Sequence, residues 1–90
     1  MFSKVDIRYL RESTSRFTVQ QLNGHDVTLH SDETGHDWMI VSNYEGADCY
    51  ILHRHCRRYP YHRQRGQYGS LSEALDYIIG HERWYVENKS

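Results

Sequence analysis

Several short segments in the first 55 positions either alternate polar and apolar residues, which is the period of a half-buried strand, or are rich in β-forming residues. Alternation or β-rich composition predicts strands at the ranges 5–9, 17–22, 27–29, 38–42 and 49–55. A short helix that begins near Lys4 is the competing interpretation of the first range. The Asn23-Gly24 pair readily adopts positive φ and predicts a tight hairpin between the second and third strands. A glycine-containing turn at 44–48 predicts another hairpin between the last two strands.

The C-terminal part of the chain follows a helical period instead. Ser70 and Glu73 have the spacing of a capping box, in which the Ser70 hydroxyl accepts from the Glu73 amide and the Glu73 carboxylate accepts from the Ser70 amide. Gly80 either ends this helix or lies inside a helix that continues to Trp84, and 84–86 is alternatively a short edge strand. Apolar residues recur on one helical face at Leu71, Ala74, Leu75 and Ile78.

These elements predict a single α+β domain that spans residues 1–90. Its fold is a meander of four or five antiparallel strands, covered on one face by a single C-terminal amphipathic helix. Residues 57–69 lack a period and contain the only proline, so we expect them to form a long loop. A register shift of one residue would turn every strand side chain to the opposite face. The predicted core consists of Val5, Ile7, Phe17, Val19, Leu29, Met39, Val41, Ile51, Leu71, Ala74, Leu75 and Ile78.

The composition of the chain indicates a folded protein without a membrane span. Hydrophobic residues make up 38% and charged residues 26% of the chain, which is typical of folded domains rather than disordered ones. No apolar run approaches the roughly twenty residues of a membrane span, and charges occupy N-terminal positions that are apolar in a signal peptide. We therefore expect a cytoplasmic protein without a membrane partner. Cys49 and Cys56 are expected to be reduced, and too far apart on one strand to form a disulfide.

Charge is distributed unevenly, although the net charge is only −1. Positions 17–48 contain six acids and no lysine or arginine, whereas positions 49–72 contain five arginines and no acid. These arginines are interleaved with tyrosines and histidines in the segment 53–68. Arginine binds carboxylates and phosphates through a planar fork, and tyrosine is a frequent anchor at interfaces. The candidate partner-binding residues are therefore Arg54, Arg57, Arg58, Tyr59, Tyr61, Arg63, Arg65 and Tyr68.

This segment predicts a small interaction protein rather than an enzyme. The expected partner is an acidic protein or a nucleoprotein complex, as for a phage-type inhibitor such as an anti-CRISPR protein. The alternative is a module that binds single-stranded nucleic acid through the same residues, although a pI near 6.6 is low for that class. Two further options are that the arginines pair with the chain's own acids, and that an exposed strand edge supports a homodimer.

Seven histidines raise two other hypotheses. On a strand, His53 and His55 would share one face and could ligate a metal ion, with a third ligand from His30, His36, His62 or His81. The sequence has no recognised metal-ligand spacing, so we predict neither a metal nor a cofactor. A histidine-dependent or metal-dependent nuclease, with His53 or His62 as acid and base, is the remaining alternative, and no catalytic motif supports it.

Overall fold

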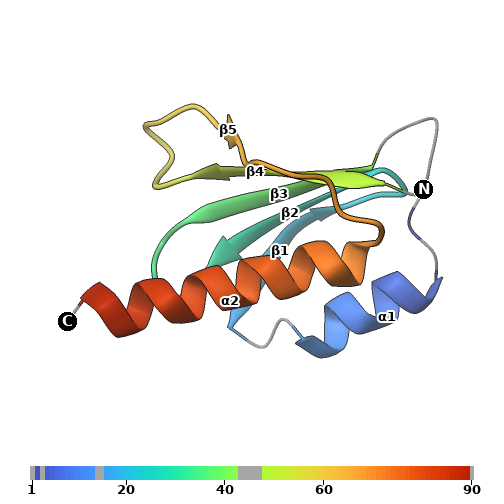
Figure 1. Cartoon of the computed structure of the whole chain (residues 1–90), viewed down its shortest axis with the longest axis horizontal. Coiled ribbons are helices and arrows are strands. Elements are labelled where there is room, and N and C mark those ends of the chain that lie inside the picture. The colour runs from blue at the N-terminus through green and yellow to red at the C-terminus, as the bar shows by residue number, and fades with distance from the viewer. Residues whose placement is uncertain (1, 3, 14–15, 43–47, 90) are drawn as a thin grey trace.

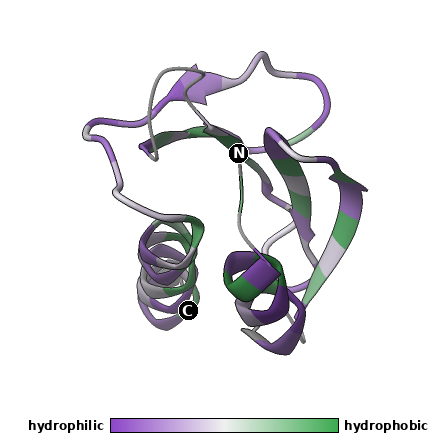
Figure 2. Ribbon diagram, turned by 90° about the vertical axis from the view of Figure 1, so that its right-hand side faces the viewer, coloured by the Kyte–Doolittle hydropathy of each residue, from purple (hydrophilic) through white to green (hydrophobic). Residues whose placement is uncertain are grey.

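The computed structural model describes residues 2, 4–13, 16–42 and 48–89. In chain order, the elements are helix α1 (Lys4–Ser13), strands β1 (Phe17–Leu22), β2 (Asp26–Ser31), β3 (Asp37–Ser42), β4 (Cys49–Arg54) and β5 (His62–Arg63), and helix α2 (Leu71–Lys89). The strands lie in sequence order in one antiparallel sheet, and both helices pack side by side on the same face of it (Figure 1, Figure 2). The predicted α+β class, an antiparallel meander with a C-terminal helix, is confirmed. No helix within the described ranges is long and apolar enough to cross a membrane.

The N-terminal segment is a helix that begins at Lys4, as the competing interpretation has it, so the strand predicted at residues 5–9 is wrong. The alternation of Val5 and Ile7 resembles a strand, but Ile7 and Leu10 are three apart and both lie against the core. Leu10 is completely buried, whereas Val5 is 76% exposed. The helix is joined to α2 by Tyr9, whose hydroxyl donates to Asp76. A second helix, α1, therefore covers the sheet beside the one that the sequence predicts.

The two strand pairs expected from the hairpins are both present. β1 pairs with β2 and β3 pairs with β4, each in antiparallel orientation. In the first hairpin, the Asn23 side-chain oxygen accepts from the amides of His25 and Asp26 at 2.8 and 2.9 Å. Neither Asn23 nor Gly24 has a positive φ, so the turn does not have the expected backbone conformation. The Asn23 side chain closes it together with a backbone hydrogen bond from the Asn23 amide to the Asp26 carbonyl, at 3.1 Å. The turn predicted at 44–48 lies almost entirely outside the described residues.

The core lies between the inner face of the sheet and the two helices. On β3 the predicted face is wrong, because Trp38 and Ile40 are buried while Met39 and Val41 lie on the outer face. The error is one residue of register, which reverses a whole strand. Four other predicted core residues, on α1 and β1, are only partly buried or exposed: Val5, Ile7, Phe17 and Val19. The predicted core residues that are buried are Leu29, Ile51, Leu71, Ala74, Leu75 and Ile78.

Helix α2 begins as the capping box predicts, with one difference. The Ser70 hydroxyl accepts from the Glu73 amide at 3.2 Å, but the Glu73 carboxylate accepts from the Gly69 amide, at 2.8 Å, instead of that of Ser70. Gly80 lies inside the helix, so the edge strand considered at 84–86 does not form. The helix packs across β3 and β4, so that its C-terminal half lies beside the start of β3 and the end of β4 (Figure 1).

The segment predicted as a loop at 57–69 contains the short strand β5, which pairs with the end of β4. Farther along the chain, Tyr68 and Cys49 exchange two backbone hydrogen bonds of 2.8 and 2.9 Å. The polar composition and the proline of this segment gave no sequence signal for either pairing. Because both ends of β4 hold it, the segment has a fixed position along this edge of the sheet (Figure 1).

Candidate functional site

The two sides of β4 carry different chemistry. Its inner residues Cys49, Ile51 and His53 are buried under the helices, whereas its outer residues are half-buried. The outer face is the side of the sheet turned away from both helices (Figure 2). Arg54 points to this outer face, because strand side chains alternate. The arginines of the 53–68 segment form what we call the arginine surface: Arg54, Arg57, Arg58, Arg63 and Arg65.

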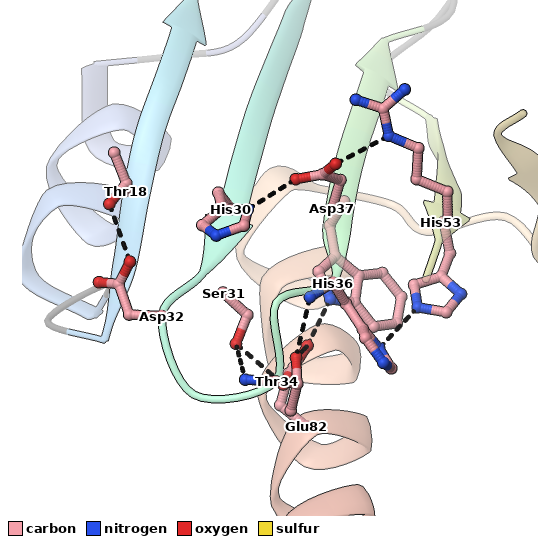
Figure 3. Close-up of polar contacts among 11 residues, drawn as sticks. Thr18, His30, Ser31, Asp32, Thr34, His36, Asp37, His53 and Glu82 are labelled. Carbon is pink, nitrogen blue, oxygen red and sulfur yellow. Dashed lines mark hydrogen bonds and ion pairs between the residues drawn. The ribbon is translucent and has the colours of Figure 1, made fainter. Parts of the chain in front are cut away.

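Arg54 is held by an ion pair and by an aromatic ring. Its Nε donates to Asp37 Oδ2 at 2.8 Å, and His30 Nδ1 lies 2.8 Å from the other oxygen of that carboxylate (Figure 3). Asp37 is only 1% exposed. Burial by itself raises the pKa of Asp37, but the hydrogen bonds from His30 and Arg54 outweigh burial, and the pKa is lowered. The Arg54 guanidinium also lies 4.3 Å from the centre of the Tyr61 ring, so this arginine is built into the sheet.

The other four arginines are exposed. Arg63, on β5, lies over the ring of Tyr50 at 4.4 Å from its centre, a contact that positions it on the outer face. Among the residues that the structure describes, Arg54 is the one member of the arginine surface that forms an ion pair with an acid. Internal pairing therefore neutralises little of this surface. The remaining three lie in the loops on either side of β5: Arg57, Arg58 and Arg65.

Acids of the 17–48 range make their contacts elsewhere. Asp32 accepts from the Thr18 hydroxyl at 3.0 Å (Figure 3), and Glu33 pairs with Arg16 at the start of β1. The acidic and basic parts of the chain thus meet in one described ion pair, that of Arg54, and otherwise form separate surfaces.

The three predicted tyrosines lie in different environments. Tyr59 is 58% exposed in the loop between β4 and β5. Tyr61 lies under an arginine, and burial raises its pKa. Tyr68 packs against the core, and its hydroxyl donates to the Arg65 carbonyl at 3.4 Å, so its position is structural. Tyr50 is part of the outer face but was not predicted, because its contact with β5 depends on a pairing that the sequence does not reveal.

Four histidines gather on the opposite, inner side of the sheet, and we call them the histidine cluster: His36, His53, His55 and His81. His53 Nε2 lies 3.0 Å from His36 Nδ1, and His36 Nε2 lies 3.3 Å from His55 Nδ1, so three rings form a hydrogen-bonded chain. Figure 3 shows the contact between His36 and His53. His81 comes from α2, with its ring centre 5.8 Å from that of His53. Burial, followed by the charges of the neighbouring histidines, lowers the pKa of His53 to about 4.

The histidine cluster does not have the geometry of a metal site. His53 and His55 contact different nitrogens of His36, so the lone pairs of the three rings do not converge on one point. Within the described ranges, no group of three or more His, Cys, Asp or Glu residues is arranged to hold a metal ion. The strand predicted to reach residue 55 ends at Arg54, yet His53 and His55 still lie on the same side, with ring centres 5.1 Å apart.

A buried carboxylate lies beside the cluster. Glu82, on α2, is 6% exposed and accepts from Trp38 Nε1 at 2.6 Å and from the hydroxyls of Ser31 and Thr34, both at 3.1 Å (Figure 3). The Trp38 ring in turn packs on His53, with ring centres 4.1 Å apart. Three neutral donors thus satisfy a carboxylate that points into the domain. This network was not predicted from the sequence, because the donors lie 44 to 51 residues from the acceptor.

Both cysteines are free thiols. The Cys49 sulfur is buried and lies 3.3 Å from the Ser70 carbonyl oxygen. Burial, together with nearby acids, raises the pKa of Cys49 to about 11, so it is a protonated and unreactive thiol at neutral pH.

Comparison with known proteins does not identify the function. No family model, no curated protein and no solved structure matched the chain. The function is therefore inferred from the arginine surface and the histidine cluster.

Proposed function

We propose that this protein is a small interaction or inhibitor protein, without catalytic activity, that binds an acidic surface of a protein or nucleoprotein partner through its arginine surface. The observation that carries the proposal is the exposure of four of its five arginines, none of which has an acidic partner among the described residues. Like charges gathered without counter-charges repel one another, and an acidic partner relieves that repulsion.

The scaffold of the surface supports the same proposal. Arg54 and Arg63 each stack on a tyrosine ring, at 4.3 and 4.4 Å from the ring centre. Side chains that are ordered before binding lose less conformational entropy when the partner arrives. Tyr59, which is 58% exposed, adds an aromatic side chain of the type that dominates binding energy at protein interfaces.

The charges outside the arginine surface favour a protein partner over a nucleic acid. The net charge of the chain is −1, and its acids are concentrated in the range 17–48. A phosphate backbone attracts the arginines but repels this acidic part. A protein or nucleoprotein partner, by contrast, can offer carboxylates to the arginines and basic groups to the acids.

The nuclease hypothesis loses one of its two candidate residues. His53 is 8% exposed and packs on Trp38, so its imidazole does not reach a substrate phosphate in solution. His62 is exposed on β5. An acid–base mechanism built on this residue alone would need the same ring to accept and donate protons in separate steps.

The test compares two variants from which four positive charges are removed. In the surface variant, alanine replaces Arg57, Arg58, Arg63 and Arg65. In the charge-matched control, alanine replaces four exposed cations of the helices, Lys4, Arg8, Arg11 and Arg83. Binding is followed by fluorescence anisotropy with a labelled oligoglutamate peptide and with labelled single- and double-stranded RNA and DNA, over a series of salt concentrations. Circular dichroism checks that both variants fold.

We expect the wild type and the control to bind the acidic peptide. The surface variant should bind it with an affinity that is lower by about tenfold or more. Equal affinities of the surface variant and the control would contradict the proposal. Tight binding of single-stranded oligonucleotides, with a steep decrease in affinity as salt increases, would replace it with the nucleic-acid alternative.

A further inference from the structure

Two members of the histidine cluster, His53 and His55, belong to the same stretch of chain as the arginine surface. His53 immediately precedes Arg54, and His55 opens the loop that leads to the exposed arginines. His36, from the loop before β3, contacts both histidines, and the ring of Tyr85 packs on it with centres 4.6 Å apart. The end of β4 and the start of the following loop are therefore fastened to the β2–β3 loop and to α2 through imidazole rings.

Counting protons shows how much acid this chain of three rings tolerates. A neutral imidazole has one donor and one acceptor nitrogen, so three neutral rings satisfy both contacts with their protons pointing along one direction. One additional proton is tolerated on His36, which then donates to both neighbours. A second additional proton breaks at least one of the two hydrogen bonds, because two N–H groups must then face each other. The chain therefore holds together only while most of it is neutral.

The surroundings do not balance such a charge. Neither nearby carboxylate is seen to hydrogen-bond to His53 or His55: Glu82 accepts from Ser31, Thr34 and Trp38, and Asp37, on the outer face, pairs with His30 and Arg54. The charge of Asp37 raises the pKa of His53, but burial and the neighbouring histidines lower it by more. Protonation of His53 therefore adds a charge at a buried position, where the unfavourable effects outweigh the attraction of Asp37. The other titratable or charged groups around the three histidine rings are not carboxylates. They are His81 and Tyr85 from α2, Arg54 from β4, and His62 from β5.

We propose that the chain His53–His36–His55 is a pH-sensitive latch, which holds the end of β4 and the following loop in place at neutral pH and releases them in mildly acidic solution. Release separates β5 from β4 and disorders the exposed arginines, so the latch regulates the arginine surface. That regulatory consequence rests on the proposed function, whereas the latch itself does not. The pKa of His53, about 4 when buried and near 6.5 when released, agrees in sign, because acid then stabilises the released state.

The test uses two single variants that each remove one histidine from the β4–β5 pair. His53→Gln keeps a polar group that can hydrogen-bond to His36 but cannot be protonated. The control is His62→Gln, because His62 lies opposite His53 in the pair but is exposed. Amide hydrogen exchange is measured by NMR at pH 7.5 and pH 5, and rates are converted to protection factors so that intrinsic pH effects cancel.

Two amides report on the two ends of β4. The Gln64 amide donates to the Ile51 carbonyl at 2.8 Å and reports on the latched end. The Tyr68 amide donates to the Cys49 carbonyl at 2.9 Å and serves as the internal reference at the other end. Their ratio separates local release from global unfolding, which would lower both protection factors together.

In the wild type and the control, we expect the protection factor of Gln64 to fall about 30-fold relative to that of Tyr68 between the two pH values, as pKa values of about 4 and 6.5 require. In His53→Gln this fall should shrink to about threefold or less. An unchanged ratio in the wild type, or an undiminished fall in His53→Gln, would overturn the latch.

A second measurement covers the case in which His53→Gln does not fold. The His53 ring is titrated by NMR in the wild-type protein, and a midpoint near 6.5 in the folded state would contradict the latch. If the latch opens in acid but the oligoglutamate peptide binds at neither pH, the proposed function fails while the latch stands.

Discussion

The inner and outer sides of β3 and β4 show that neighbouring residues of one strand have different roles. On the inner side, Trp38 and His53 are stacked beneath α2 and linked to Glu82, in a network that has little access to solvent. On the outer side, Met39 and Arg54 are only half-buried. We therefore expect a substitution on the inner side to change the stability of the fold. A substitution on the outer side should mainly change binding, except at the ion pair between Arg54 and the buried Asp37. Because successive side chains of a strand point to opposite faces, neighbouring residues belong to different sides of the sheet. The pattern of charges along the sequence does not show which residue lies on which side.

The most demanding test of this division truncates two adjacent residues of β3. Trp38→Ala is expected to lower the free energy of unfolding by about 4 kcal/mol, because it removes a fully buried ring and takes an indole donor from Glu82. Met39→Ala should cost only about 1 kcal/mol, since that side chain is half-buried on the outer face. Urea unfolding of both variants measures the difference. Equal losses would mean that the two faces of β3 do not differ in burial.

The next effect is the pH dependence of stability that His53 contributes. Its pKa in the folded state, about 4, is below the 6.5 of an unfolded chain, so between these values the unfolded state binds a proton that the folded state does not. The contribution is complete above pH 6.5 and is lost as the pH falls toward 4, by about 3 kcal/mol over the whole interval. Thermal unfolding of the wild type and His53→Gln at several pH values isolates it. Identical pH profiles would contradict the assignment to His53.

The outer side of the sheet was easier to predict from the sequence than the inner side. Uneven charge is visible along the chain, so the arginines of 53–68 can be recognised from the sequence alone. The burial of His53 cannot, because it depends on which face of β4 points to the helices. The contact between Glu82 and Trp38 spans 44 residues, and no local pattern encodes a contact of that range.

The elements divide in the same way. The strands β1 to β4 and helix α2 could be predicted because periodicity and capping are local signals. Helix α1 was only the competing interpretation of its range, because five residues are too few to distinguish a period of two from one of 3.6. The residue that decides, Leu10, lies just beyond the range 5–9. Strand β5 contains only two residues, His62 and Arg63, and exists because β4 offers it an edge.

A smaller contrast separates two arginines that both stack on tyrosine rings. Arg54→Ala should lower the free energy of unfolding by about 2 kcal/mol, because it takes the guanidinium away from the buried carboxylate of Asp37 and leaves that carboxylate its contact with His30. Arg63→Ala should cost under about 0.5 kcal/mol, since this side chain is exposed and has no described ion pair. Urea unfolding gives both values. A loss at Arg63 as large as that at Arg54 would place Arg63 among the structural residues.

A slight gain in stability is expected at a residue of α2 that points away from the histidine cluster. Gly80 lies inside the helix, and a Cβ at this position would meet nothing within 4 Å. Gly80→Ala should therefore raise the free energy of unfolding by about 0.5 to 1 kcal/mol, because alanine restricts the unfolded chain more than glycine does. Differential scanning calorimetry of the variant and the wild type measures the gain.

The matched control is Gly35→Ala, which also has open space around the new methyl group but has a φ of 77°, a conformation that alanine adopts with strain. This variant should lose about 1 kcal/mol in the same calorimetric measurement. If Gly80→Ala instead destabilised the protein, the side of α2 at Gly80 would not be the open, solvent-facing surface that the structure shows. The next residue, His81, contacts the histidine cluster, so the boundary between the buried and solvent-facing sides of this helix is expected between Gly80 and His81.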